Sequence, residues 1–96
     1  MTFSLEITTE ANLEIVEAYV YYEEKQAGLG ERFLKQLDKY FIKILQTPKH
    51  YAVKRKPYRE AFIRKFPFLI IYEVTEEKII VYSVFNTSRN PTKKPE

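Results

Sequence analysis

Four cationic side chains near the predicted C-terminal strands are the residues best suited to chemistry: Arg59, Arg64, Lys65 and Arg89. A guanidinium group rarely acts as a base, but it binds phosphate through two parallel hydrogen bonds and stabilises developing charge. RNA-cleaving sites can be built mainly from such groups, which makes Arg64 and Arg89 candidate catalytic residues. The alternative is structural, with each cation paired to an acid such as Glu60 or Glu73, or to the end of a strand.

Other catalytic groupings are weak. His50 is the single histidine, and a lone loop histidine is more often a surface residue than a general base. Glu10, Glu14 and Glu17 could form a paired-carboxylate site on one side of a helix, but a solvated face is the better explanation. The chain has no cysteine, which excludes disulfides and thiolate metal sites. We expect no metal and no cofactor.

Charge is distributed unevenly along the 96 residues, whose formal net charge is +3. Acids outnumber bases in residues 1–48, whereas bases outnumber acids in residues 49–96 and gather between Lys49 and Lys65. Such a field attracts phosphates or acidic partner segments. The alternative is an edge strand whose lysines and arginine oppose aggregation.

Two helices are predicted in the first half of the chain. Thr8 or Thr9 offers an N-cap oxygen, and apolar residues then recur at helical spacing. Gly28 and Gly30 permit a tight turn before a second helix, which ends at Pro48. The short connection predicts an antiparallel helical hairpin.

Strands are expected at residues 3–7, 52–56, 60–66, 68–75 and 78–85. This order predicts an α+β fold: an N-terminal strand, the helical hairpin, and then an antiparallel sheet of three or four strands packed on the helices. We expect one domain over residues 1–86 and a polar tail over residues 87–96.

An apolar outer face of the sheet is predicted because two helices can cover only one face. Strand alternation points five apolar residues away from the helices: Phe62, Leu69, Ile71, Val81 and Phe85. An exposed apolar patch usually marks a binding site, so these residues predict a protein partner or a dimer. The alternative is that the tail folds back over the patch.

The sequence favours a cytoplasmic protein with no membrane partner. No apolar run approaches the ~20 residues of a membrane-spanning helix, and the N-terminus lacks the basic region of a signal peptide. The absence of cysteine suits a reducing compartment.

Several short motifs, in order, resemble the RelE/ParE superfamily of bacterial type II toxin–antitoxin toxins across nearly the whole chain. The matching motifs are Ala18-x-x-x-Tyr22-Glu23, Gly28-Leu29-Gly30-x-x-Phe33, Pro48-x-x-Tyr51, Arg64-Lys65-Phe66-Pro67-Phe68-x-Ile70-x-Tyr72 and Ser88-Arg89-Asn90-Pro91. The resemblance implies a toxin in a hetero-oligomer with a cognate antitoxin, whose C-terminal segment wraps the hairpin and the sheet. The outer patch is then the antitoxin-binding surface.

The resemblance implies one of two targets. RelE-like members cleave mRNA on the ribosome, and ParE-like members poison DNA gyrase. RelE-like nucleases carry lysines at positions matching Glu60 and Phe62, and arginines at positions matching Leu69 and Arg89, so only Arg89 is kept here. The helical motifs are closer to ParE, although Asn86 stands where ParE-like members commonly have a histidine. We expect a gyrase inhibitor; the alternatives are a ribosome-dependent mRNA endonuclease and an inactive binding module.

Overall fold

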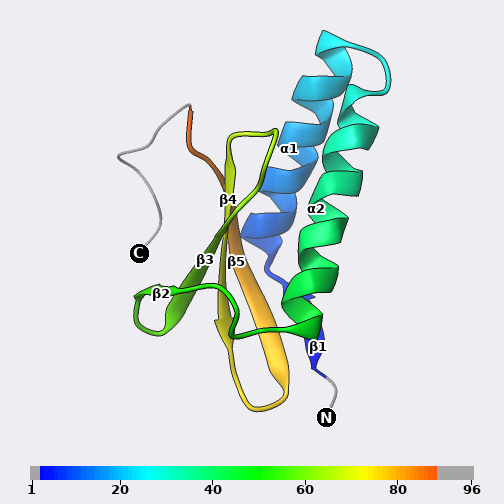
Figure 1. Ribbon diagram of the computed structural model, residues 1–96. Coiled ribbons are helices and arrows are strands. Elements are labelled where there is room, and N and C mark those ends of the chain that lie inside the picture. The colour runs from blue at the N-terminus through cyan, green and yellow to red at the C-terminus, as the bar shows by residue number, and fades with distance from the viewer. Residues whose placement is uncertain (1–2, 89–96) are drawn as a thin grey trace.

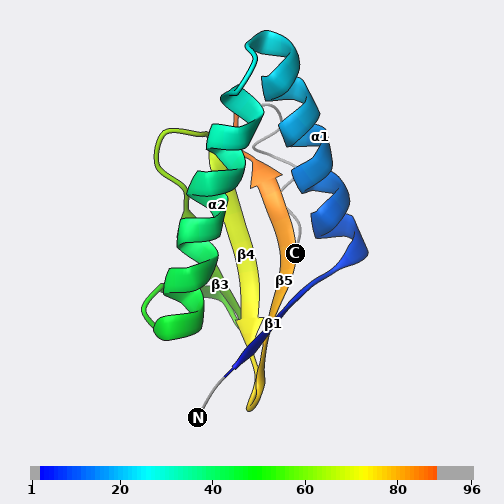
Figure 2. The ribbon, with the colours of Figure 1, turned by 90° about the vertical axis from the view of Figure 1, so that its right-hand side faces the viewer.

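The computed structural model describes residues 3–88 and shows two helices lying side by side over one face of a sheet (Figures 1 and 2). The elements are β1 (Ser4–Ile7), α1 (Thr9–Lys25), α2 (Leu29–Gln46), β2 (Val53–Arg55), β3 (Tyr58–Phe62), β4 (Phe68–Val74) and β5 (Lys78–Asn86). None of the helices in this part of the chain is long and apolar enough to span a membrane.

The sheet has five strands in the order β1-β5-β4-β3-β2. Strand β1 runs parallel to β5, and the other neighbours are antiparallel. The predicted α+β fold is confirmed, and the N-terminal strand adds one parallel edge to the mostly antiparallel sheet. Strand β3 begins and ends earlier than expected. It ends at Phe62 because residues 63–67 form a loop in which Lys65 has a φ of 77°.

Local capping explains where the helices begin and end. The Thr8 side chain accepts a hydrogen bond from the Ala11 N–H at 3.1 Å, which confirms the N-cap of α1. Helix α2 ends at Gln46, directly before Thr47 and Pro48, because the residue before proline is pushed out of the helical region.

The helical hairpin is closed by Glu23. Gly28 has a φ of 90°, a conformation that residues with a β-carbon adopt at a cost. The two Glu23 carboxylate oxygens accept hydrogen bonds from the N–H groups of Gly28 and Gly30, each at 2.9 Å. These bonds satisfy donors at the start of α2 that have no partner within the helix.

The main core lies between the helices and the inner face of the sheet. Its centre includes Phe33, Ile44, Ile70 and Tyr72, all fully or almost fully buried. The Tyr72 hydroxyl donates to the Pro48 carbonyl at 2.9 Å, so the buried polar group is satisfied. Burial raises the pKa of Tyr72 to about 12.

The prediction that Val81 faces outward is wrong. Ile71 pairs with Ser83 while the next residue, Tyr72, pairs with Val81, so Tyr82 is an extra residue in β5. Such a bulge reverses the alternation of side chains. Val81 therefore belongs to the main core and is fully buried, whereas Phe85 lies on the outer face as predicted.

The predicted outer patch is also less exposed than expected. Leu69, Ile71 and Phe85 form a small second core, packed against Tyr58, and are 3%, 4% and 9% exposed. Phe62 alone of the predicted set is exposed, at 63%. The tail that was considered as a cover for this face lies mostly outside the described residues.

Candidate functional site

A groove follows the seam between α1 and β5. Two adjoining cavities of about 380 Å³ each share Glu14 and form this α1–β5 groove. Glu17, Ala18, Tyr21, Phe68, Val84, Phe85 and Asn86 line one cavity, and Thr8, Glu10, Tyr58, Ile71, Tyr82 and Ser83 line the other.

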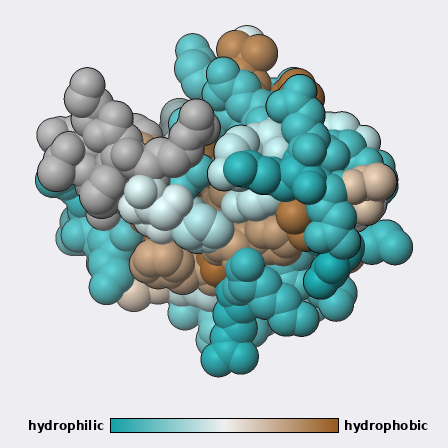
Figure 3. Space-filling view, turned by 90° about the horizontal axis from the view of Figure 1, so that it is seen from above, coloured by the Kyte–Doolittle hydropathy of each residue, from teal (hydrophilic) through white to brown (hydrophobic). Residues whose placement is uncertain are grey.

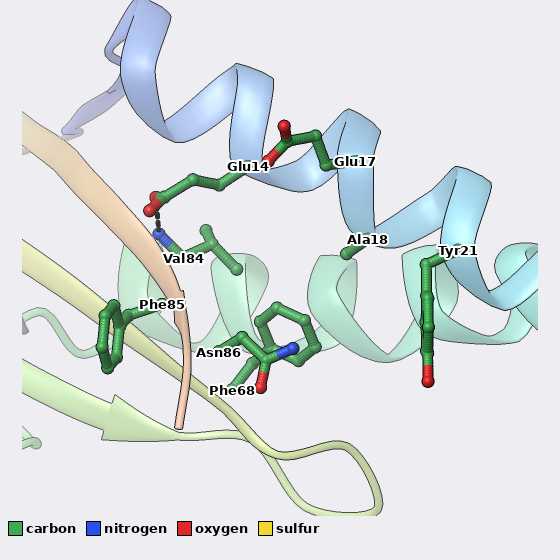
Figure 4. Close-up of a pocket in the computed structure, with 8 residues that line it drawn as sticks. All are labelled: Glu14, Glu17, Ala18, Tyr21, Phe68, Val84, Phe85 and Asn86. Carbon is green, nitrogen blue, oxygen red and sulfur yellow. Dashed lines mark hydrogen bonds between the residues drawn. The ribbon is translucent and has the colours of Figure 1, made fainter. Parts of the chain in front are cut away.

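The first cavity opens near the end of β5. Figure 4 shows Glu14, Glu17, Ala18 and Tyr21 along the helix and β5 residues opposite them. Seen from above, apolar surface lies in a hollow bordered by hydrophilic side chains (Figure 3). The residues that line the groove combine apolar side chains with carboxylates and other polar groups, the usual composition of a protein-binding groove.

The groove runs along the half of β5 that pairs with β4 on one side and, among the described residues, has no strand on the other side. Strand β1 pairs with β5 only from Lys78 to Val81. Beyond that point Glu14 covers the edge, because its Oε1 accepts from the Ser83 hydroxyl and from the Val84 N–H, both at 2.9 Å. An edge strand whose backbone groups already have partners resists pairing with another chain. The Glu14 carboxylate is such a partner for the Val84 N–H, so helix α1 protects this part of the edge.

The second cavity is aromatic and acidic. The Tyr58 and Tyr82 rings meet edge to face with centroids 5.5 Å apart. The Tyr82 hydroxyl donates to Glu73 Oε1 at 2.8 Å, and this bond raises the pKa of Tyr82. Carboxylates line both cavities, and no cation of residues 3–88 does, so the groove suits a partner segment with apolar and basic side chains.

Helix α1 also carries a second apolar face. Leu13, Val16 and Val20 are 58%, 49% and 45% exposed and recur at helical spacing. They lie beside Glu17 on the side away from the core. This stripe extends the apolar surface beyond the groove, over the outside of the helix.

Of the two predicted catalytic arginines, Arg64 and Arg89, the structure describes only Arg64. Arg64 lies in the β3–β4 loop and is exposed; its N–H donates to the Tyr40 hydroxyl at 3.0 Å. Arg89 lies outside the described residues. Arg59 has a structural role, because its guanidinium donates to the carbonyls of Tyr51 at 2.7 Å and Lys49 at 3.3 Å.

Glu14 and Glu23 are the residues whose roles sequence reasoning missed. Glu14 had been considered only as part of a carboxylate pair or a solvated face. For Glu23, a glutamate shortly before two glycines was the available signal. His50 is exposed and contacts the Tyr51 ring. In residues 3–88, no three acidic or histidine side chains are grouped to hold a metal ion.

Solved structures share this arrangement of a helical hairpin on a sheet. The structure is similar to a chromosomal ParDE system from P. aeruginosa, with a TM-score of 0.78 and 15% identity over 88% of this chain and 96% of that one. It is also similar to an E. coli RelE toxin mutant in complex with a peptide of the antitoxin RelB. That match has a TM-score of 0.68 and 17% identity over 100% and 97% of the two chains.

Sequence comparison identifies the family of the chain. Residues 5–91 match the family described as "ParE toxin of type II toxin-antitoxin system, parDE", and the chain belongs to this family. Toxin ParE2 of Mycobacterium tuberculosis is 27% identical over 92 residues, covering 95% of this chain and 88% of that protein.

Proposed function

We propose that this ParE-family chain is a toxin that inhibits DNA gyrase, does not cut RNA, and is neutralised by a cognate antitoxin bound in the α1–β5 groove. The observation that carries the choice of target is the outer face of the sheet. Glu60, Phe62 and Leu69 occupy the positions where the RelE-like nucleases are expected to carry cations. Leu69 is 3% exposed and packed in the second core, so none of these three positions offers a cation to a phosphodiester.

The groove supports the antitoxin part of the proposal. Its carboxylates (Glu10, Glu14 and Glu17) complement a basic segment, and its floor accepts apolar side chains. The similar RelE structure holds an antitoxin peptide, which is consistent with a toxin of this fold binding a short segment. Of the predicted antitoxin contacts, Ile71 and Phe85 line the groove itself, and Phe62 is exposed elsewhere on the sheet. These three residues, with Leu69 paired to Phe85, remain proposed contacts.

The remaining cations, Arg64 and Arg89, are proposed to contact the target. Arg64 is exposed, with its backbone groups held by α2. Its side chain is free to reach a partner surface. Under the proposal, Arg64→Ala and Arg89→Ala weaken gyrase binding without changing the fold.

Induction of the chain in cells tests the target. Plasmid supercoiling and mRNA integrity are followed separately, with and without the antitoxin encoded by a neighbouring reading frame. The expected result is growth arrest with altered supercoiling, intact mRNA and rescue by the antitoxin. Codon-phased mRNA cuts that disappear in Arg89→Ala would establish the nuclease alternative instead, and absence of any growth effect would indicate an inactive binding module.

A further inference from the structure

Helix α2 carries a row of cations on one side. Arg32, Lys35, Lys39 and Lys43 follow one another at spacings of three and four residues, which places them on one face of a helix. All four are exposed. Over these positions the helix rises roughly 16 Å, so the cations form a track rather than a point.

The β3–β4 loop adds two more cations beside this track. Gln36 Nε2 donates to the Arg64 carbonyl at 3.3 Å, and the Arg64 N–H donates to the Tyr40 hydroxyl at 3.0 Å. These bonds hold the loop against α2, and the loop lies beside α2 in Figure 2. Arg64 and Lys65 are exposed there, and they complete a set of six that we call the basic track.

Two cavities follow the basic track and share Lys39. One, of about 650 Å³, is lined by Lys39, Tyr40, Lys43, Tyr51, Phe62, Ile63 and Arg64. The other, of about 450 Å³, is lined by Tyr22, Leu29, Arg32, Lys35, Gln36, Lys39, Lys65, Phe66 and Pro67. Within the described part of the chain no acid lines either cavity, in contrast to the α1–β5 groove on the other helix.

The basic track is not neutralised within the described part of the chain. Among residues 3–88, none of its six cations forms an ion pair with an acid. Lys43 lies over the Tyr51 ring, 5.8 Å from its centroid. Unpaired like charges in a row repel one another unless an external anion is bound, which indicates an anionic ligand.

We propose that the basic track binds single-stranded nucleic acid. A row of cations matches the regular charges of a phosphate backbone. Phe62 is 63% exposed beside the same cavity and offers a ring on which an unpaired base can stack. An acidic peptide would contact the cations but has no base to stack on the Phe62 ring. A duplex keeps its bases paired inside the helix and away from that ring.

The basic track shares no residue with the α1–β5 groove, although Phe62 beside it is also a proposed antitoxin contact. The proposed binding needs no nuclease activity. It goes beyond gyrase inhibition, because it concerns the purified chain and an oligonucleotide alone. If the chain does not bind an oligonucleotide, gyrase inhibition can still be correct. If the chain does not inhibit gyrase, oligonucleotide binding can still be correct.

Fluorescence anisotropy of the full chain tests the proposal. The probes are labelled oligo(dT) and oligo(rU) of about 12 nucleotides, within the range of single-strand site sizes. The variants are Lys39→Gln/Arg64→Gln, Phe62→Ala, and two controls away from the track: Lys25→Gln and Leu13→Ala. Circular dichroism confirms that each variant is folded, and gels confirm that the probe stays intact.

Binding of either probe that weakens with salt supports the proposal, and preference for one identifies the natural ligand as DNA or RNA. We expect Lys39→Gln/Arg64→Gln to weaken binding about tenfold or more and to flatten the salt dependence by about 0.7 per lost phosphate contact. Phe62→Ala should weaken binding roughly tenfold at an unchanged salt slope, with both controls unaffected. The proposal is overturned by absent binding, by equal loss in Lys25→Gln, or by equally tight binding of duplex DNA or polyglutamate.

Discussion

Glu14 of α1 and Val84 of β5 are 70 residues apart in sequence and joined by a hydrogen bond of 2.9 Å from the Val84 N–H to Glu14 Oε1. The same oxygen accepts from the Ser83 hydroxyl. One carboxylate therefore ties the first helix to the last strand and forms the wall shared by both cavities of the α1–β5 groove. Stability and the shape of the proposed antitoxin site depend on the same side chain.

Replacing this carboxylate should lower stability. Glu14→Ala leaves the buried Ser83 hydroxyl and the Val84 N–H without their acceptor, which should cost about 2 kcal/mol of unfolding free energy. Glu14→Gln keeps one oxygen acceptor and should cost about 1 kcal/mol. Urea unfolding measures both, with the exposed Glu17→Ala as control. Equal midpoints for Glu14→Ala and Glu17→Ala would show that the edge does not need the carboxylate.

The two hairpin glycines should respond differently to a β-carbon. At Gly30 a β-carbon would lie 2.8 Å from the Tyr19 carbonyl oxygen and from Glu23 Oε1, so Gly30→Ala should cost about 2–3 kcal/mol through overpacking. At Gly28 there is space but φ is 90°, so Gly28→Ala should cost only about 1 kcal/mol. Thermal and urea unfolding of the pair measure this order. A larger loss for Gly28→Ala would contradict it.

Alkaline pH should destabilise the fold through Tyr72. Burial raises its pKa to about 12 from an ordinary value of 10.0. Between these values the unfolded chain has lost the proton while the native chain still holds it, so stability falls as pH rises. Tyr72→Phe, although less stable at neutral pH, should show a shallower decline from pH 10 to 12. If the stability of the wild-type chain and of Tyr72→Phe falls equally steeply with pH, the buried Tyr72 hydroxyl is not a source of the pH dependence.

Charge reversal on the groove should slow antitoxin binding. Glu10→Lys/Glu17→Lys replaces two acids that line the groove and should lower the association rate about tenfold at low salt. Glu76→Lys/Glu77→Lys makes the same charge change in the β4–β5 turn and is the matched control. Biolayer interferometry with the cognate antitoxin measures both. An equal decrease in association rate for the two double variants would mean that the net charge of the chain, and not the charge of the groove, sets the rate of antitoxin binding.

The sequence predicted the parts of the fold that depend on local patterns. Thr8 as a cap, the glycine hinge and Pro48 all act through neighbouring residues, and they hold in the structure. The position of Val81 could not be predicted, because the bulge at Tyr82 is defined by pairing with β4. Strict alternation assigns the wrong face on one side of any such bulge.

The candidate groove was beyond prediction for a similar reason. Glu14 looks like one of several helix glutamates, and its role appears only when β5 lies beside α1 with half an edge unpaired. The outer patch was predicted as exposed because Leu69 and Ile71 alternate correctly, yet packing with Phe85 and Tyr58 buries them. Sequence spacing identifies the face of a strand, but only tertiary contacts determine its exposure.

Supercoiling of relaxed plasmid by purified gyrase, in the presence of the purified chain, tests the central claim most directly. The account predicts that inhibition rises with toxin concentration, is relieved by the antitoxin, and is weakened in Arg64→Ala and Arg89→Ala. Full gyrase activity at every toxin concentration, from a folded chain that still binds its antitoxin and still arrests growth, would contradict it.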